Sequence, residues 1–539
     1  MAALPAEIVD CSGFLLQCAQ RGRHMPSEFK NEHIMDFSQE QNRKRQAEAL
    51  ELIQSQLGRE YDLIIGTERV KSGKTFKSIN PSRKSEVVGV FQSATTEQAV
   101  EAIHVASRTF ERWKRVSAQQ RADVLFRAAA LLRARRFENN AWMIVETGKT
   151  WVEADADTAE AIDFCEFYGR EALRYAGPQL LTRLPTEDSE LRYIPLGVGA
   201  VIPPWNFPCA ILAGMTTAAL VTGNAVVLKP SSDSPAVAAF FMSILQEAGL
   251  PPGVVNFVTG SGSTVGNILV ENPKVRFVAF TGSKEVGLHI NEESARPRPD
   301  QIWIKRVVAE MGGKDFIIVD EDADLDAALT GVVVSAFGYQ GQKCSACSRL
   351  IVHEKIYPTF LQRLAEKAAN IKVGPATDPT SSMGPVINEN AMKNILQYIE
   401  IGKKEGKLAT GGGSAEGDGF YIQPTVFIDV DPASRIAKEE IFGPVLAVMK
   451  SKDLDQAIKI ANDSEYGLTG SVYCTDREHI RRAKEECHVG NLYINRKCTG
   501  ALVGVHPFGG FNMSGTDSKA GGRDYLLLFT QAKAISEKI

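Results

Sequence analysis

Short β-rich runs alternate with helical segments along residues 198–287, and this alternation restricts the fold more than any other feature of the chain. Ser234-Pro235 has the form of a helix cap followed by a first turn, so a helix should begin there and end at Gly249. The alternation predicts an α/β fold with a parallel, doubly wound sheet covered by helices on both faces. The β-rich runs are Val198–Ile202, Ala225–Leu228, Val254–Val258 and Arg276–Phe280.

The turns after these runs should meet at one crevice, because ligands of doubly wound sheets bind at the carboxyl ends of the strands. Gly262 and Gly266 belong to a G-x-G-x-x-x-G turn, one residue longer than the usual dinucleotide fingerprint. Ser283 and Gly287 belong to a second helix start of the same kind. Small residues let a backbone approach phosphates at a helix N-terminus. Two such turns favour a dinucleotide, although glycine turns that bind nothing are the alternative.

A second β/α pattern runs from Phe316 to about Gly490, so we expect a second α/β domain in this chain of 539 residues. The acidic residues between Asp320 and Asp326 resemble part of a calcium loop. They lack its glycine and its terminal glutamate, so we favour a capped helix start. Near the C-terminus, the pattern predicts a helix or turn from Arg523 and then a strand over Leu526–Phe529.

Upstream of residue 198 the pattern is mainly helical. Asp36–Leu57 is charged and rich in helix-forming residues, which predicts a surface helix. Thr95-x-x-Gln98 and Ser117-x-x-Gln120 are capping boxes that precede apolar residues on one helical face. The first 24 residues match neither a signal peptide nor a transit peptide. We interpret them as a lead-in, with Met25 as an alternative start.

The segment Phe337–Ser345 places Cys344 in a glycine-containing loop after an apolar helical run. A partly exposed thiol beside Lys343 would lie in an electropositive setting, which favours the nucleophilic thiolate. The alternative is a buried structural cysteine, which is how most free cysteines behave. Cys344 and Cys347 also form a C-x-x-C, which could be a redox pair or half of a zinc site. No second such pair and no paired histidine spacing accompanies it, so we expect neither metal binding nor redox use.

Composition limits the partners of the chain. The nine cysteines are odd in number and irregularly spaced, which fits reduced thiols in a cytoplasmic compartment. A net charge of −4 gives no basic footprint for nucleic acid. No apolar run reaches the roughly 18 residues of a membrane span. We therefore expect a soluble cytoplasmic protein that binds neither nucleic acid nor membrane.

Six motifs, in order and spacing, resemble the aldehyde dehydrogenase superfamily from about residue 60 to the C-terminus. They are Pro204–Phe207, Lys229-Pro230, Phe280–Ser283, Glu310–Lys314, Gly341–Cys344 and Glu440–Pro444. The resemblance implies a Rossmann-type NAD-binding domain over residues 36–177 and 195–309 and an α/β catalytic domain over 310–505. It also implies an N-terminal extension, residues 1–35, and a small β oligomerisation flap made of a hairpin at 178–194 and a C-terminal strand within 506–539.

The resemblance implies an NAD-dependent aldehyde dehydrogenase in which Cys344 attacks the aldehyde to give a thiohemiacetal. The Asn206 amide and the Cys344 N–H would hold the oxyanion, and loss of one such donor typically costs about 10²–10³ in rate. Hydride transfer to the nicotinamide would leave a thioester, and Glu310 would activate the water that hydrolyses it. Taken alone, Asn206 could be a turn residue and Glu310 a surface charge at a strand end.

The same resemblance assigns the cofactor contacts. Lys229 would bind the adenosine ribose, and Ser283 the pyrophosphate. Ser232 stands where relatives that strongly prefer NAD often place a glutamate. Without that carboxylate a 2′-phosphate is not repelled, so we expect NAD as the main cofactor and some use of NADP. Glu440 would hold the nicotinamide ribose and Phe442 would pack near the ring, and the remaining cofactor residues are Pro204, Trp205, Gly262, Gly266 and Gly287.

Segments 495–504 and 507–510 resemble the L-glutamate γ-semialdehyde (1-pyrroline-5-carboxylate) dehydrogenases of proline degradation. In that group the α-carboxylate of the substrate meets the serine after the cysteine and two consecutive backbone amides, here Ser345, Gly500 and Ala501. N–H groups of a small-residue loop suit an anion, because no side chain blocks its approach. Phe207 and Phe508 would flank the aliphatic part of the substrate, although both could be core residues.

We therefore expect oxidation of L-glutamate γ-semialdehyde to L-glutamate by at least a homodimer, with a dimer-based hexamer left open. Within the family, the alternatives are another semialdehyde, an aliphatic aldehyde, or a coenzyme A-acylating reaction that the presence of Glu310 disfavours. A catalytically idle structural relative is the alternative of a different kind. The intact Cys344, Glu310 and Asn206 argue against it.

Overall fold

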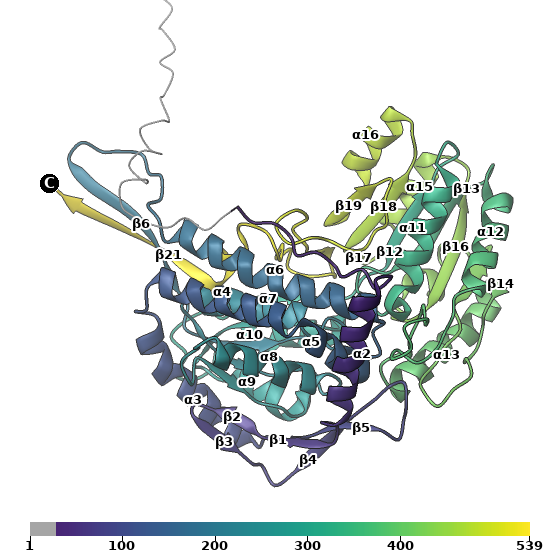
Figure 1. Cartoon of the computed structure of the whole chain (residues 1–539). Helices are drawn as coiled ribbons and strands as arrows, with labels where there is room; N and C mark the ends of the chain where they lie inside the picture. Colours follow the sequence, from purple (N-terminus) through teal and green to yellow (C-terminus); the bar gives the residue numbers. More distant parts are fainter. Residues whose placement is uncertain (1–27) are drawn as a thin grey trace, which may run out of the picture. The chain divides into compact units, whose positions relative to one another are not determined.

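The computed structural model describes residues 28–539, of which Asn31–Ile539 form one compact unit (Figure 1). The predicted lead-in over residues 1–24 and Met25 lie outside the described residues. Residues 28–35, the described part of the predicted extension, contain no helix or strand. The predicted surface helix follows as α2 (Glu40–Gln54).

A seven-stranded sheet in the order β11-β10-β7-β8-β9-β2-β3 is the framework of the N-terminal half. The strands from β11 to β9 are parallel, and β2 and β3 at the edge are antiparallel. The four predicted β-rich runs correspond to β7–β10, which confirms the doubly wound α/β sheet. The strands are β2 (Leu63–Ile65), β3 (Glu68–Val70), β7 (Val198–Ile202), β8 (Ala225–Leu228), β9 (Val255–Phe257), β10 (Val275–Thr281) and β11 (Arg306–Glu310).

Helices cover both faces of this sheet, since its strands are apolar on both sides. One face carries α3 and α9 over a core that includes Ile103, Val227 and Leu269, and the other carries α7 with α6 packed against it. Both predicted capping boxes are present, at Thr95 on α3 and Ser117 on α4. The helices are α3 (Thr96–Trp113), α4 (Ala118–Ala134), α5 (Arg136–Thr147), α6 (Trp151–Tyr175), α7 (Ala210–Val221), α8 (Pro235–Glu247), α9 (Asn267–Glu271) and α10 (Lys284–Ala295), with the π-helical turn η1 (Gly262–Gly266).

Helix α8 begins where predicted, but the cap is not the one expected. The Ser234 side chain makes no capping hydrogen bond. Instead the carboxylate of Glu146, at the end of α5, accepts from the backbone N–H of Ala236 at 2.8 Å and of Val237 at 2.9 Å. Burial raises the pKa of Glu146 to about 7, against the lowering effect of these donors. A contact between residues 90 apart thus replaces the local cap.

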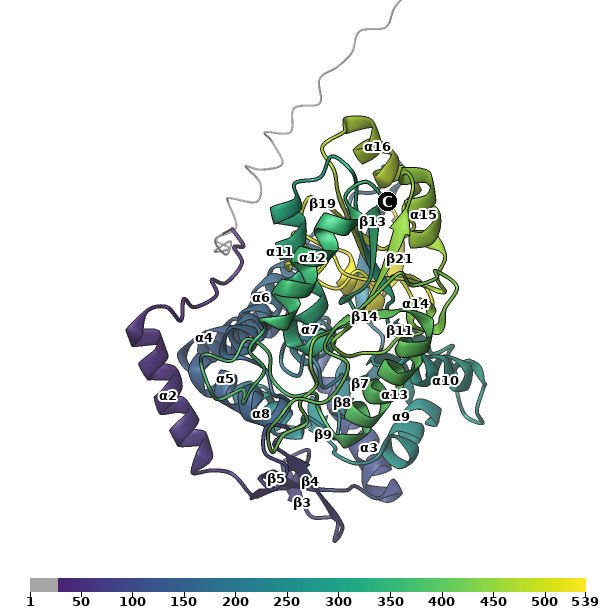
Figure 2. The same cartoon turned by 90° about the vertical axis from the view of Figure 1, so that its right-hand side faces the viewer.

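A second seven-stranded sheet, in the order β14-β15-β16-β13-β12-β18-β19, carries the C-terminal half (Figure 2). Only β14 is antiparallel to its neighbour. Helices α11 and α12 pack on one face and α13 to α16 on the other, each over a continuous apolar core. The strands are β12 (Asp315–Val319), β13 (Cys347–His353), β14 (Lys407–Thr410), β15 (Thr425–Ile428), β16 (Val445–Ser451), β18 (Thr469–Tyr473) and β19 (Asn491–Ile494).

The acidic run before α11 is a capped helix start, as predicted. Asp324 accepts hydrogen bonds from the backbone N–H of Asp326 and Ala327, and the described residues contain no cluster of ligands that could hold a metal ion. The helices of this half are α11 (Leu325–Phe337), α12 (Tyr357–Ala369), α13 (Glu389–Glu405), α14 (Arg435–Lys438), α15 (Leu454–Asn462) and α16 (Arg477–Glu486).

Three smaller groups of strands complete the structure. A ribbon pairs β6 (Glu187–Pro195) with β21 (Thr530–Lys538) along nine antiparallel residue pairs (Figure 1). Residues 178–194 therefore do not form a hairpin by themselves, because their strand pairs with the C-terminal segment. The other groups are β1 (Arg59–Tyr61) with β5 (Val87–Gln92) and β4 (Thr75–Ile79), and β17 (Tyr466–Gly467) with β20 (Phe511–Asn512).

The predicted strand over Leu526–Phe529 is wrong. Tyr525–Phe529 form a 3₁₀ turn, η3, and the strand begins at Thr530. Tyr525, Leu526 and Phe529 are all buried. A turn with a period of three or four residues directs these side chains into the core together, whereas a strand would point neighbours to opposite faces.

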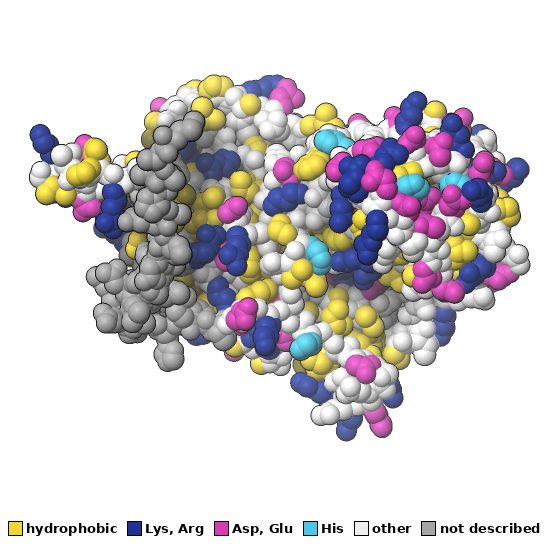
Figure 3. Space-filling view, turned by 90° about the horizontal axis from the view of Figure 1, so that it is seen from above, with side chains coloured by type: hydrophobic (Ala, Val, Ile, Leu, Met, Phe, Trp, Pro, Cys, Tyr) yellow, Lys and Arg dark blue, Asp and Glu magenta, His cyan; other side chains and the backbone are white. Residues whose placement is uncertain are grey.

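Charged side chains of both signs are intermingled on the surface around α16 (Figure 3). Several of them are paired along that helix, including Arg481 with Glu485 and Arg482 with Glu486. Within residues 28–539, none of the helices combines the length and the apolar character that crossing a bilayer demands.

We expect Glu146→Ala to lower the free energy of unfolding by about 2 kcal/mol or more, because α8 loses its cap and a void opens beside it. Ser234→Ala is the matched control and should cost less than about 0.5 kcal/mol. Denaturant unfolding at pH 8 measures both. A larger loss for Ser234→Ala than for Glu146→Ala would contradict the assigned cap.

Candidate active site

A cleft of about 1160 Å³ lies at the carboxyl ends of the strands of the first sheet and extends to the segment that carries Cys344. It is the crevice expected from the doubly wound topology. Cys344 and Asn206 both contribute to its wall. Nine of the ten predicted cofactor residues also line it, namely Pro204, Trp205, Lys229, Ser232, Gly262, Gly266, Ser283, Glu440 and Phe442.

Cys344 follows the short 3₁₀ turn η2 (Gly338–Gly341). The turn contains three consecutive left-handed residues, Tyr339, Gln340 and Gly341, with φ values of 50°, 55° and 66°. The Glu153 carboxylate holds it by accepting from the Tyr339 N–H at 2.5 Å. Strained backbone of this kind persists only where the surroundings fix it, and here it directs the cysteine into the cleft.

The expected electropositive setting of the thiol is wrong. The ammonium of Lys343 lies against Gly338 in the preceding turn, where the Glu153 carboxylate faces it. Burial raises the pKa of the Cys344 thiol, and three nearby carboxylates raise it further. These are Asp315, Glu310 and Glu440. The resting form is therefore the thiol, and its attack on a carbonyl requires a proton acceptor.

Asn206 lies in the turn after β7 and is buried. Its Nδ2 donates to the carbonyl of Gln342 at 3.1 Å, which fixes the amide beside the backbone that leads into Cys344. A side-chain amide and a cysteine N–H placed together can stabilise an oxygen that becomes negative as sulfur attacks a carbonyl.

Glu310 ends β11 and approaches from the side of the 509–518 segment. Its Oε1 accepts from the Ser518 hydroxyl and from the Ser518 N–H at 3.3 Å. Its Oε2 is buried and has no protein partner among the described residues. Burial raises the pKa of Glu310 to about 7, although the Ser518 hydroxyl lowers it. A carboxylate with one free oxygen and this pKa suits a general base at neutral pH.

The glycines after Glu310 allow three segments to meet. A Cβ on Gly313 would lie 2.2 Å from the carbonyl oxygen of Cys344, and one on Gly312 would lie 2.2 Å from Oε2 of Glu440. The Gly313 N–H donates to Oε1 of Glu440 at 2.9 Å. Sequence reasoning included these glycines in a motif but missed this role, which the paired glycines themselves could have indicated.

Glu440 and Phe442 occupy the cleft wall opposite the first sheet. Burial raises the pKa of Glu440 to about 7, while the Gly313 N–H and Lys314 lower it. Phe442 has a left-handed backbone with φ of 56° and packs edge-on against Trp205, with ring centroids 5.5 Å apart.

The far end of the cleft fits an adenosine diphosphate. A Cβ added at Gly262 or Gly266 would meet no atom within 4 Å, so the backbone there is open to a ligand. Ser283 caps α10, whose N-terminus also faces the cleft. Burial lowers the pKa of Lys229 to about 8. Gly287 is the one predicted cofactor residue outside the cleft wall, and its missing side chain instead makes room for Met311.

The loop Thr499–Val503, here called the anchor loop, lies next to the nucleophile. The Ser345 carbonyl accepts from the Cys498 thiol at 3.4 Å, two residues before Gly500. Arg496 donates to the carbonyls of Thr499 and Gly500, each at 3.0 Å, and Gly500 has φ of 75°. The first bond holds the residue that precedes the anchor loop beside Ser345, and the other two hold the start of the loop against Arg496.

The two predicted aromatic residues lie in different settings. Phe207 lies beneath the buried Lys149 ammonium, which is 4.2 Å from its ring centroid and pairs with Asp157 at 3.4 Å. Phe508 is half-buried and exchanges backbone hydrogen bonds with Ala520.

A further carboxylate near this region was missed from the sequence. Burial raises the pKa of Glu160 on α6 to about 8, and Asp157 and Asp163 raise it further, while Lys149 lowers it. Glu160 is half-buried, and a carboxylate with a raised pKa near Lys149, the lysine that contacts Phe207, is a candidate partner for a cationic group. The sequence signal for this carboxylate was the spacing of three acidic residues, Asp157, Glu160 and Asp163, along one face of α6.

Cys344 and Cys347 of the C-x-x-C do not pair with each other. Cys347 is buried in β13 and interacts with Cys498, not with Cys344. Cys347 is thus a buried cysteine of the core.

Comparison with known proteins gives a consistent result. Residues 69–535 match the model of the aldehyde dehydrogenase family. The 1-pyrroline-5-carboxylate dehydrogenase of Geobacillus sp. (strain WCH70) is 55% identical over 513 residues, which cover 95% of this chain and 100% of that protein. A structure of 1-pyrroline-5-carboxylate dehydrogenase from Thermus with bound NAD superposes with a TM-score of 0.94 at 51% identity, covering 95% of this chain and 100% of the other.

We expect Gly313→Ala to destabilise the fold by about 2 kcal/mol or more, because the added methyl group meets the Cys344 carbonyl, a backbone atom that cannot turn away. Gly413→Ala is the matched control, since the nearest atom to its Cβ lies at 3.8 Å. Thermal unfolding compares the two. Equal stability of both variants would contradict the close approach at Gly313.

Proposed function

The chain belongs to the aldehyde dehydrogenase family, and from this premise we propose that it oxidises L-glutamate γ-semialdehyde to L-glutamate with NAD, the second step of proline degradation. The observation that carries the substrate assignment is the position of the anchor loop. Cys498, which directly precedes this loop, donates its thiol to the carbonyl of Ser345, the neighbour of the nucleophile, and this bond supports placing Gly500 and Ala501 near the same serine. A carboxylate held there sits a few bonds from a carbonyl at Cys344.

The first chemical step is the attack of the Cys344 sulfur on the aldehyde carbon. The thiol proton leaves as the C–S bond forms, and Glu310 is the acceptor we assign because its pKa of about 7 leaves a large ionised fraction at neutral pH. The aldehyde oxygen becomes an alkoxide, which the Asn206 amide and the Cys344 N–H stabilise. Each donor of this kind contributes about 3–4 kcal/mol to the transition state.

The second half of the reaction is hydride loss followed by hydrolysis of the thioester. Loss of hydride from the former aldehyde carbon converts the thiohemiacetal to a thioester, and bound NAD supplies the acceptor for that hydride. Glu310 releases the thiol proton to solvent and then takes a proton from water as the water oxygen attacks the thioester carbon. The C–S bond breaks, the leaving sulfur recovers a proton from Glu310, and L-glutamate leaves. The partnerless Oε2 of Glu310 is the oxygen available to that water.

The lining of the cleft offers a group for each part of NAD. The open backbone at Gly262 and Gly266 suits the pyrophosphate with Ser283, and Lys229 suits the adenosine ribose. Glu440 would hold the nicotinamide ribose, with Phe442 and Trp205 beside the ring, and Pro204 and Ser232 complete the contacts. Because Ser232 carries no charge, we propose that the site also tolerates the 2′-phosphate of NADP.

The substrate has three features to be recognised. Ser345 and the N–H groups of Gly500 and Ala501 are assigned to its α-carboxylate, and Phe207 and Phe508 to its methylene groups. We assign Glu160 to its α-ammonium, because this half-buried carboxylate lies one turn after Asp157, whose partner Lys149 contacts the Phe207 ring.

We assign cofactor binding to residues 36–177 and 195–309 and catalysis to residues 310–505. Residues 178–194 and 506–539 are assigned to oligomerisation as a homodimer or a dimer-based hexamer. The exposed β6–β21 ribbon supports this assignment, with Leu180 92% exposed just before it. The free cysteines support a cytoplasmic location.

A substrate panel tests the function. We expect Ser345→Ala to raise the KM for L-glutamate γ-semialdehyde by about tenfold or more, because a hydrogen bond to a charged group is lost. The KM for propanal, which has no carboxylate, should stay within about twofold. The absorbance of NADH at about 340 nm measures the KM for each aldehyde.

Cys344→Ala is the control for background and should form no NADH while NAD still binds. A wild-type enzyme that oxidises propanal as efficiently as the semialdehyde would contradict the proposed substrate. Equal effects of Ser345→Ala on both aldehydes would remove Ser345 from the carboxylate site.

A pH profile tests Glu310. Its folded pKa of about 7 means that the ionised, proton-accepting form increases as pH rises, so kcat should rise through about pH 7. Ser518→Ala removes a donor that stabilises the ionised form and should therefore move the midpoint upward by about one pH unit. The matched control is Thr516→Val in the same segment, whose hydroxyl bonds the backbone of Ala309. A downward shift for Ser518→Ala, or equal shifts for both variants, would contradict the role of Glu310.

A further inference from the structure

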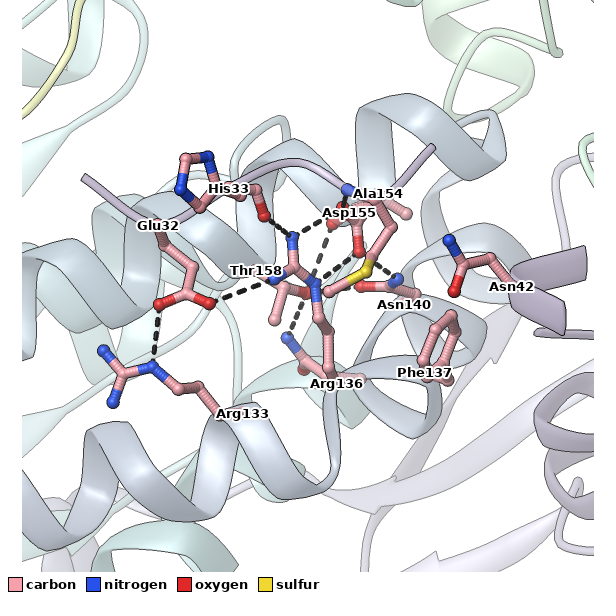
Figure 4. Close-up of polar contacts among 12 residues, drawn as sticks. Glu32, His33, Asn42, Arg133, Arg136, Phe137, Asn140, Ala154, Asp155 and Thr158 are labelled. Carbon is pink, nitrogen blue, oxygen red and sulfur yellow. Dashed lines mark hydrogen bonds and ion pairs between the residues drawn. The ribbon is translucent and has the colours of Figure 1, made fainter. Parts of the chain in front are cut away.

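The segment Asn31–Asp36, here called the strap, lies across α6 in an extended form without helix or strand (Figure 4). Its contacts are hydrogen bonds and ion pairs to buried carboxylates and arginines. The strap binds Asp155 and Asp163 in the N-terminal half of α6, and Glu160, assigned above to the substrate ammonium, lies between them in the sequence.

The central contact is a buried ion pair. Arg136 donates two bonds of 2.6 Å to Asp155, and both side chains are almost fully buried. The strap completes their coordination, because the Met35 N–H donates to Asp155 at 2.6 Å and the His33 carbonyl accepts from Arg136 at 2.7 Å. Buried charges need all of these partners, so the strap is held firmly at this point.

The first residues of the strap bind a second carboxylate on α6. Asp163 accepts from the Glu32 N–H at 2.7 Å and from Nδ2 of Asn31 at 2.8 Å. The Glu32 side chain pairs with Arg133 at 2.7 Å on the outer side. Asp163 lies one helical turn after Glu160, so this end of the strap is next to the carboxylate assigned to the substrate.

Asn31 has a second acceptor, and it belongs to the anchor loop. The same Nδ2 donates to the carbonyl of Val503 at 2.9 Å. An amide nitrogen has two hydrogens, so both are used, one toward α6 and one toward the loop. Val503 is buried and lies two residues after Ala501, and the next residue, Gly504, donates to Gly521 at 2.8 Å.

We propose that Asn31 is a positioning residue that sets the distance between the anchor loop and α6, and so the fit of the substrate carboxylate. The inference rests on the proposed function, in which Gly500 and Ala501 hold that carboxylate. Arg496 fixes the start of the loop through the Thr499 and Gly500 carbonyls, and Asn31 fixes its end. Between these two points the N–H groups of Gly500 and Ala501 keep their direction.

Asn31→Ala removes both bonds of the bridge. We expect the KM for L-glutamate γ-semialdehyde and the Kd for L-glutamate, measured by titration calorimetry, to rise about fivefold, the effect of one neutral hydrogen bond. The kcat at saturation and the KM for propanal should stay within about twofold, because neither depends on the carboxylate. This separation is a readout that a general loss of stability does not produce.

Glu32→Gln is the matched control within the strap. It removes the ion pairs with Arg133 and Arg136 but leaves the Glu32 N–H and Asn31 in place. It should lower the melting temperature and leave the ratio of the two KM values unchanged. An equal change of that ratio in both variants would overturn the assignment to Asn31.

If Asn31→Ala does not fold, Asn31→Ser is used instead, because its hydroxyl keeps one donor. We expect it to raise the KM for L-glutamate γ-semialdehyde by about twofold. An unchanged Kd for L-glutamate in the variant that folds overturns the inference while the proposed function stands. A wild-type enzyme without preference for the semialdehyde over propanal overturns the proposed function itself, so the two failures are distinguishable.

Discussion

The contact of three chain segments at Gly312 and Gly313 is the constraint on which the active site depends. The Cys344 carbonyl and the Glu440 carboxylate both occupy space that a side chain at these positions would fill. Glu310 lies only two residues before them, at the end of β11. Cys344, Glu310 and Glu440, the proposed nucleophile, base and cofactor-binding carboxylate, are thus positioned by one crossing of main chains between the two sheets.

Burial decides the protonation states around this crossing. The thiol is surrounded by carboxylates that raise its pKa, while Glu310 and Glu440 have pKa values near 7. The cysteine is therefore held as a thiol until a neighbour accepts its proton. A thiol is less readily oxidised than a thiolate, so this setting also protects Cys344 from oxidation. An ammonium beside the sulfur would lower the pKa of the thiol and favour the thiolate at all times. The Lys343 ammonium instead lies against Gly338.

Much of the fold could be predicted because its signals are local. The alternation of β-rich and helical runs, the capping boxes at Thr95 and Ser117, and the rule that loops gather at strand ends each need only neighbouring residues. The features that were missed depend on distant contacts. Glu146 replaces Ser234 as a cap from 90 residues away, Ser518 reaches Glu310 from 208 residues away, and the core draws Leu526–Phe529 into a turn. No pattern within one segment encodes such partners.

The β6–β21 ribbon has a consequence for protein engineering. Its last residue, Ile539, is 85% exposed at the tip, where its N–H still bonds to Thr186. The tip lies at the end of the molecule away from the second sheet (Figure 1). A fluorescent protein or purification handle fused to this end would be carried clear of the catalytic cleft. It would stand beside the open edges of a two-stranded ribbon, which are free to accept further strands.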